Sequence, residues 1–173
     1  MDKELFFERV HKYKDTVFRV AYSYCKNKSD AEDISQEVFL KYYTAFPNIS
    51  DESEEKAWLI RVTINKSKDL LKSSWYSKRC DCDNLRETYQ INGAQSELLD
   101  VVLSLPDKYK IVIHLYYYEQ YTISEISKIT GRKPSTVQTQ LQRGRKLIEK
   151  KLKEENEYEQ NLIQYGYGQN HNE

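Results

Sequence analysis

Cationic and amide side chains share one face of an expected helix at residues 54–73. They are spaced i, i+4, i+7 and i+11, and they are Arg61, Asn65, Lys68 and Lys72. Residues at these intervals align along a helix. Asn can form paired hydrogen bonds with a base edge, while Arg and Lys bind phosphate. The spacing therefore predicts a nucleic-acid-binding surface.

Two tryptophans accompany this stripe. Trp58 lies one helical turn before Arg61, and Trp75 lies near the end of the helix. Aromatic rings can stack on exposed bases, which contributes roughly 1–3 kcal/mol per base. The alternative for Trp58 is an ordinary core residue. The preceding loop, FPNISDESEE, is acidic and unsuited to phosphate, but a loop of this kind can form a pocket for one extruded base.

Residues 122–153 predict two helices joined by a tight turn. Thr122 and Glu125 have the spacing of a capping box, Gly131 suits a left-handed helix end, and Pro134 suits the first turn of a second helix. The apolar stripes are Ile123, Ile126 and Ile129, then Val137, Leu141 and Ile148. This pattern is typical of a helix-turn-helix.

The outward face of the second helix carries hydroxyls, amides and cations. They are Thr136, Gln138, Thr139, Gln142, Arg143 and Lys146. These groups can donate hydrogen bonds to base edges and phosphates, as the second helix of a DNA-binding helix-turn-helix does. The alternative for this segment is a helical hairpin with a solvated polar face.

A third polar face lies on an expected helix that Ser29 and Glu32 would cap and that ends near Phe46. It consists of Asp33, Gln36, Glu37 and Lys41. Paired carboxylates can act in acid–base catalysis, but no second catalytic group accompanies Asp33 and Glu37. A partner-binding face or a plain surface face are the other interpretations.

Enzymatic and metal sites have little support in the sequence. It contains no phosphate-binding glycine loop, dinucleotide fingerprint or nucleophile elbow. Cys80 and Cys82 form a C-x-C without further ligands nearby, so we expect linker thiols rather than a zinc site. The three histidines are scattered and are expected to be structural or surface residues: His11, His114 and His171.

Formal charge is neutral overall, with 27 basic and 27 acidic residues, but it is divided along the chain. Residues 57–80 carry 6 basic and 1 acidic side chains, and residues 108–153 carry 11 and 3. The other segments are net acidic. Because counterion release is local, each basic segment can bind phosphate while the whole chain stays neutral.

The elements that must position these faces are helical. Five Gly and three Pro in 173 residues, with 31% charged residues, favour an all-α protein. We expect a first bundle at residues 1–73, with helices near 5–25, 29–46 and 54–73, the last capped by Ser53.

A linker is expected at residues 74–95 because no period is sustained there. The second unit is expected at residues 96–153, with Ser96 capping a helix to residue 105 and Pro106 opening one to residue 118. The acidic segment 154–173 is expected to be a disordered tail. No apolar run approaches the roughly 20 residues of a membrane span, so we expect a cytoplasmic protein.

Taken together, these segments resemble bacterial RNA polymerase sigma factors of the extracytoplasmic-function group. The resemblance rests on SDAEDISQEVFLKYY (29–43), KAWLIRVTINKSKDLLK (56–72), LSLPDKYKIVIHLYYYEQYTISEIS (103–127) and STVQTQLQRGRKLIEKKL (135–152). With the first helix they cover about 145 residues in the order of the family. It implies an alternative sigma factor with no cofactor and no enzymatic activity, and two helical domains that bind core RNA polymerase and promoter DNA.

The resemblance also implies residue roles. Asp33, Gln36 and Glu37 match positions that bind the β′ coiled coil of the polymerase, and the β flap is a further expected partner. The stripe with Trp58 matches the segment that recognises and melts the −10 element. The outward face of the second turn helix matches the reader of the −35 element. An anti-sigma factor is an expected partner, without direct membrane insertion.

The sequence departs from the family pattern at Gln138, where many members carry Arg, and in the acidic loop 51–55. Gln favours adenine geometrically, so the recognised sequence is expected to differ. The main alternative function is a stand-alone helix-turn-helix regulator, which would bind duplex DNA without polymerase and would need its own dimer surface.

Overall fold

The computed structural model describes residues 2–45, 49, 51–73 and 95–166, and this part of the chain is built from helices joined by short turns. The N-terminal unit consists of α1 (Lys3–Cys25), α2 (Lys28–Ala45) and α3 (Glu52–Lys72). α1 packs against both α2 and α3, and the buried residues of all three helices form the interior of a three-helix bundle. The fold class expected from the sequence is confirmed.

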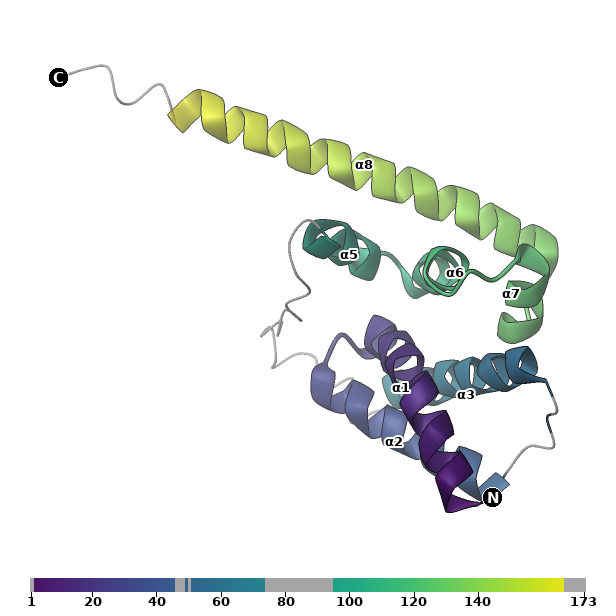
Figure 1. Ribbon diagram of the computed structural model, residues 1–173. Coiled ribbons are helices and arrows are strands. Elements are labelled where there is room, and N and C mark those ends of the chain that lie inside the picture. Colours follow the sequence, from purple (N-terminus) through teal and green to yellow (C-terminus); the bar gives the residue numbers. More distant parts are fainter. Residues whose placement is uncertain (1, 46–48, 50, 74–94, 167–173) are drawn as a thin grey trace.

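The C-terminal unit consists of α5 (Gln95–Ser104), α6 (Asp107–Tyr117), α7 (Ile123–Thr130) and α8 (Pro134–Gly166). Figure 1 shows α8 as a long helix lying across α5, α6 and α7, which separate it from the N-terminal unit. Helices α7 and α8 are the two helices of the expected helix-turn-helix.

Two helix starts differ from the sequence expectation. The side chain of Asn27, not Ser29, accepts the free N–H of Asp30 at 3.0 Å. The side chain of Asp51, not Ser53, accepts the N–H of Glu54 at 3.3 Å. Asn and Asp cap at least as well as Ser, and each lies two residues earlier, so each helix gains its first turn sooner.

The turn of the helix-turn-helix follows the sequence expectation closely. Thr122 and Glu125 form a reciprocal capping box at the start of α7. Gly131 ends that helix with φ 69°, a left-handed conformation that residues with a Cβ adopt at a cost. α8 then begins at Pro134. The entry angle of α8 is therefore fixed by local sequence on both sides of the turn.

The C-terminal segment is the largest departure. α8 continues to Gly166, well beyond the end expected near Lys153, so a disordered tail beginning at residue 154 is wrong for 154–166. Glu, Lys and Gln are good helix formers, and ion pairs one turn apart support the extension. Lys153 contacts Glu149 at 2.7 Å and Lys150 contacts Glu154 at 3.6 Å. The expected linker thiols and Trp75 lie outside the described residues.

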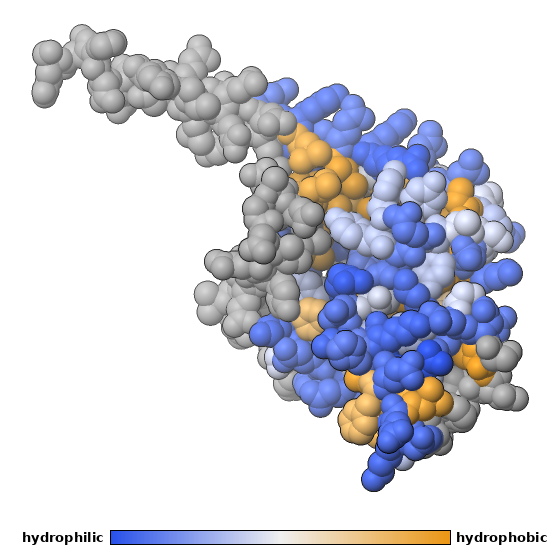
Figure 2. Space-filling view, in the orientation of Figure 1, coloured by the Kyte–Doolittle hydropathy of each residue, from blue (hydrophilic) through white to orange (hydrophobic). Residues whose placement is uncertain are grey.

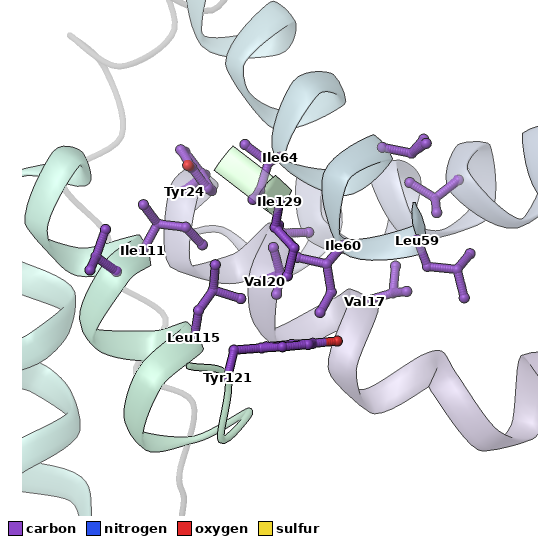
Figure 3. Close-up of a cluster of buried hydrophobic side chains, with 14 of the residues drawn as sticks. Val17, Val20, Tyr24, Leu59, Ile60, Ile64, Ile111, Leu115, Tyr121 and Ile129 are labelled. Atoms are coloured by element: carbon purple, nitrogen blue, oxygen red, sulfur yellow. The ribbon is translucent and has the colours of Figure 1, made fainter. Parts of the chain in front are cut away.

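The two units share one hydrophobic interior. Figure 3 shows side chains from both meeting in a single cluster, with Val17, Val20, Tyr24, Leu59, Ile60 and Ile64 from the N-terminal unit and Ile111, Leu115, Tyr121 and Ile129 from the C-terminal unit. α1 packs against α6, and α3 packs against α7. The surface in Figure 2 is mostly hydrophilic, with hydrophobic residues in separate areas, so much of the apolar surface lies between elements.

Candidate nucleic-acid interface

The outward face of α8 is entirely exposed. The six residues expected to contact the −35 element are all on it: Thr136, Gln138, Thr139, Gln142, Arg143 and Lys146. Val137 and Leu141, on the opposite side, are 0% and 3% exposed and anchor the helix on α6 and α7. The buried stripe thus sets the rotation of α8, and this rotation presents the polar stripe to solvent.

A surface pocket of about 280 Å³ adjoins the first turns of α8. It is lined by Lys108, Tyr109, Ser135, Thr136, Thr139, Gln140 and Arg143. A hydrogen bond from Arg143 lowers the pKa of the Tyr109 phenol, with the charge of Lys108 acting in the same direction. The pocket therefore favours a negative group. Lys108 and Tyr109 come from α6 and were missed by the sequence interpretation, although Lys108 opens the second basic segment.

α8 sits unusually close to α6 at Gly144. This residue is buried, and a Cβ added to it would lie 2.9 Å from Cγ1 of Ile113. Such a distance is too short for ordinary packing, so glycine is needed where the two helices cross. The close crossing brings Lys108 of α6 beside the polar face of α8. The sequence interpretation had no periodic signal for it.

The α3 stripe points toward the C-terminal unit. The guanidinium of Arg61 donates to the backbone carbonyl of Lys128 in α7, at 3.2 Å. Lys68 is half-buried, and burial lowers its pKa, with the charges of Arg132 and Lys72 adding to the effect. Arg61, Asn65 and Lys72 are all exposed. The four residues share one face as expected, and α7 lies against part of that face.

Trp58 is half-buried and packs beside Tyr42 of α2, with ring centroids 6.0 Å apart. Its ring is therefore partly in the core of the N-terminal unit and partly open. The side chain is therefore packed against the core without being fully buried in it.

The polar face of α2 is also exposed. Asp33, Gln36 and Glu37 all reach solvent, and Glu37 pairs with Lys66 of α3 at 2.5 Å. Leu40, one turn further along, is 63% exposed. This leucine extends the acidic–amide face with an apolar contact that the charge pattern alone did not indicate.

A buried carboxylate fixes α3 against its neighbours. Glu55 accepts hydrogen bonds from the hydroxyls of Tyr13 (3.2 Å) and Tyr42, and Arg9 lies 3.5 Å away. Burial is the main cause that raises the pKa of both phenols, with Glu55 adding to it. Both tyrosines therefore remain protonated donors, and the start of α3 is tied to α1 and α2.

Neither a metal centre nor a membrane helix is found in the described part of the chain. No group of three or more His, Cys, Asp or Glu side chains within residues 2–45, 49, 51–73 and 95–166 could hold a metal ion. None of the helices in these ranges combines the length and the apolar character needed to cross a membrane.

Comparison with protein families gives two matches in sequence order. Residues 9–76 match Sigma-70 region 2, and residues 95–148 match Sigma-70, region 4. Together the two matches span more than half of the 173 residues. The first contains the polar faces of α2 and α3, and the second contains the helix-turn-helix.

Similar curated proteins are sigma factors. The chain is 28% identical over 171 residues to the ECF RNA polymerase sigma factor SigW of Bacillus subtilis (strain 168), covering 88% of this chain and 91% of SigW. It is also 28% identical over 156 residues to SigV of the same organism, covering 88% of this chain and 94% of SigV.

Two solved structures share the fold. One is the sigma factor RpoE in complex with the anti-sigma factor NepR from Bartonella quintana, with a TM-score of 0.70 and 19% identity over 86% of this chain and 96% of that chain. The other is CnrH in complex with the cytosolic domain of CnrY, with a TM-score of 0.65 and 18% identity over 88% of this chain and 90% of that chain.

Proposed function

The chain belongs to the extracytoplasmic-function group of the sigma-70 family, and from this premise we propose how its exposed faces divide the work of an alternative sigma factor. Such a factor binds core RNA polymerase and gives it promoter specificity. We assign residues 1–73 to polymerase and −10 recognition and residues 96–153 to −35 recognition.

The −35 element is assigned to the exposed face of α8. Its amides and hydroxyls can read base edges in the major groove, and its cations can bind phosphates. The pocket with Lys108 and Tyr109 adds a phosphate contact beside Arg143, because its charge favours a negative group. Gln138 is the residue with the strongest geometric preference for one base, adenine.

The −10 element is assigned to the α3 stripe. Asn65 supplies base recognition, whereas Arg61, Lys68 and Lys72 supply phosphate contacts. The exposed part of the half-buried Trp58 side chain is assigned to stacking against an unpaired base. Melting by this face needs no ATP, since binding energy offsets the few kcal/mol needed to extrude a base.

We assign the binding of core polymerase to the polar face of α2. Asp33, Gln36 and Glu37 form an exposed acidic–amide surface, and Leu40 adds an apolar contact at its end. We propose that this face binds the β′ coiled coil and that the C-terminal unit contacts the β flap. In the solved structures, RpoE is in complex with the anti-sigma factor NepR, and CnrH is in complex with the cytosolic domain of CnrY. We propose an anti-sigma partner here as well, a cytoplasmic location and no enzymatic activity.

The observation that carries this proposal is the pairing of two cationic faces on separate helical units with a third, acidic–amide face. A stand-alone helix-turn-helix regulator does not require a second basic face such as the α3 stripe. An enzyme using Asp33 and Glu37 lacks a second catalytic group on the same face.

Run-off transcription with core polymerase on a promoter library tests the proposal. We expect promoter-specific transcripts only when the chain is present, and the enriched promoters give the recognised sequences. Duplex binding by the chain alone, without any stimulation of core polymerase, would instead support the stand-alone regulator.

A further inference from the structure

Helix α8 is longer than the part of it that matches the family. The match to Sigma-70, region 4 ends at residue 148, whereas α8 runs from Pro134 to Gly166. Figure 1 shows the end of α8 extending past α5. The family match therefore assigns no role to residues 149–166 of this helix.

The inner side of α8 continues to pack beyond the end of that match. Its buried and half-buried residues are Leu141, Gly144, Leu147, Ile148, Lys151 and Leu152. Leu147 and Ile148 lie against the hydrophobic core, and α5 also contacts α8. This packing sets the rotation of α8 as far as Leu152, so the side chains on its outer side are held in a fixed direction.

The outer side of α8 carries one stripe that crosses the end of the match without interruption. Its residues are all exposed and are spaced alternately three and four apart: Thr136, Thr139, Arg143, Lys146, Lys150 and Lys153. This spacing keeps them on one side of a helix, with a drift of about 20° for every seven residues. The stripe begins with two hydroxyls and ends with four cations. The last two, Lys150 and Lys153, have no part in the −35 contact assigned above.

The part of α8 assigned to the −35 element is already long enough to cross the major groove. From Thr136 to Lys146 the helix rises about 15 Å, whereas the groove is about 12 Å wide. Lys153 lies about 10 Å further along the same axis. Beyond the edge of the groove, DNA presents phosphates and sugars rather than base edges. The change from hydroxyls and amides to cations along α8 matches this change of ligand.

Two carboxylates lie beside these lysines. Lys153 pairs with Glu149 at 2.7 Å, and Lys150 pairs with Glu154 at 3.6 Å. All four side chains are well exposed, and ion pairs of this kind contribute little to stability, so a phosphate can replace either carboxylate. Residues 143–153 carry six cations and one carboxylate, whereas residues 154–159 carry four carboxylates and no cation. The cationic part of the stripe therefore ends at Lys153.

We propose that Lys150 and Lys153 bind the phosphate backbone of the duplex that flanks the −35 element, next to the base pairs read by the first turns of α8. The two lysines are continuous with the −35 face, lie on the same side of the helix and carry the charge opposite to that of their ligand. Such contacts add affinity that does not depend on base sequence. This inference rests on the proposed function, because it extends the DNA contact that the function assigns to α8.

Duplex binding by the full chain at several salt concentrations tests this assignment. Both probes carry the −35 sequence that the chain selects from a random duplex pool. The short probe ends at the element, and the long probe continues for about ten base pairs, one turn of DNA, on each side. Lys150→Gln and Lys153→Gln are each expected to weaken binding of the long probe by about fivefold to tenfold at about 0.1 M salt. The slope of log affinity against log salt is expected to become shallower by about one for each variant, whereas binding of the short probe stays within about twofold of wild type.

Lys151→Gln is the matched control. It removes the same charge from the same helix, but from the half-buried inner side. Its affinity for the long probe and its salt slope are expected to equal those of wild type, and circular dichroism is expected to show the same helicity for all three variants. An equal loss in Lys151→Gln would show a general effect of net charge and overturn the assignment. Unchanged slopes in Lys150→Gln and Lys153→Gln, or equal losses on the two probes, would overturn it as well.

Initiation by core polymerase separates this inference from the proposed function. A chain that does not stimulate polymerase, but shows the lysine-dependent slope on the long probe, contradicts the proposed function and supports the flanking contact. A chain that stimulates polymerase, but binds the long and short probes equally well, supports the function and overturns the flanking contact. A wild-type chain that selects no duplex from the pool overturns it too.

Discussion

At the scale of single residues, two buried carboxylates stabilise different parts of the structure. Glu55 binds partners within the N-terminal unit and fixes the start of α3. Glu119, in the turn between α6 and α7, binds Arg19 of α1 and Lys56 of α3 across the interface between the two units. A buried carboxylate is tolerated only when it is paired and hydrogen-bonded, so both positions depend on residues distant in sequence.

Replacing Glu55 is expected to destabilise the N-terminal unit. Glu55→Ala leaves the buried hydroxyls of Tyr13 and Tyr42 without their acceptor, which costs about 1–3 kcal/mol in the free energy of unfolding. Urea denaturation followed by circular dichroism measures this change. Glu54→Ala, at an exposed neighbouring position, is the control and is expected to stay within about 0.5 kcal/mol of wild type. Equal stabilities for the two variants would contradict the assigned role of Glu55.

Gln138 is expected to determine preference at one −35 base pair. Gln138→Ala removes a pair of hydrogen bonds to a base, so discrimination at that position is expected to fall by about 1–3 kcal/mol. Selection of bound −35 sequences by wild type and variant measures the change. Unchanged preference at every position would mean that α8 is placed incorrectly in the groove.

Lys72 provides the contrasting case on the −10 side. Lys72→Ala is expected to weaken promoter binding by the polymerase holoenzyme equally across sequences. The slope of log affinity against log salt is expected to become shallower by about one. Titration of a labelled promoter at several salt concentrations measures both. A change in sequence preference would assign Lys72 to base recognition instead.

Residue periodicity explains why the polar faces of α3 and α8 could be predicted from the sequence. The stripes on α3 and α8 repeat at helical intervals, and each opposes a buried apolar stripe that sets its orientation. Glu119 lies in the segment YYYEQY and has no such repeat. Its role depends on Lys56 and Arg19, which are 63 and 100 positions away. No local spacing encodes such a contact.

At the scale of elements, the crossing of α8 over α6 depends on one missing side chain. Gly144→Leu places a side chain against Ile113, where even a Cβ would be 2.9 Å away. Overpacking of this kind costs about 1–3 kcal/mol, and the displaced α8 is expected to lose −35 binding as well. Urea denaturation and duplex binding measure the two effects.

Lys150→Leu is the stability control for this substitution, because it places the same side chain at an exposed position of the same helix. Its stability is expected to remain near wild type. A Gly144→Leu chain with wild-type stability and DNA binding would show that Ile113 can move aside at little cost.

Element boundaries were predicted best where two signals coincide. The start of α7 has both halves of a capping box, and the turn after it has glycine followed by proline. At the starts of α2 and α3 only one capping signal was used for each, and the residue two positions earlier forms the bond instead. The length of α8 was underestimated because an acidic, weakly periodic segment lowers the expected tertiary packing, whereas ion pairs and propensity still favour helix.

At the scale of the whole molecule, a neutral chain carries two basic segments that packing of the two units brings near each other. Lys68 of the first lies close enough to Arg132 of the second for the charges to act on its pKa. Repulsion between these charges opposes packing of the two units against each other. The carboxylate of Glu119 offsets that repulsion at the interface between the units. The sequence could predict both units, but not their packing, since linear charge counts contain no information about which faces meet.

Acid is expected to open the chain. Burial alone would raise the pKa of Glu119, but His114, Lys56 and Arg19 outweigh it and hold that pKa well below its usual range. When the two units separate, Lys56 and Arg19 move away from Glu119, so the pKa of Glu119 returns toward the ordinary value of about 4.3. A carboxylate with a lower pKa in the packed form stabilises the packing above that value and loses the effect as pH falls below it.

Scattering between pH 8 and pH 3 checks this expectation. The groups that face Glu119 are Arg19 and Thr16 from α1, Lys56 from α3, and His114 from α6. The radius of gyration is expected to stay constant above about pH 5 and to increase below about pH 4.3 while helicity persists. Glu119→Gln removes the titrating carboxylate and is expected to lose this step. Expansion centred between pH 5 and 8 would assign the switch to another group.

The apolar cluster that joins the two units in Figure 3 is expected to make their packing sensitive to temperature. Contacts of this kind are driven near room temperature by the release of ordered water, and that driving force fades on cooling. Cooling is therefore expected to weaken the apolar contact between the two units before it weakens the ion pairs beside that contact.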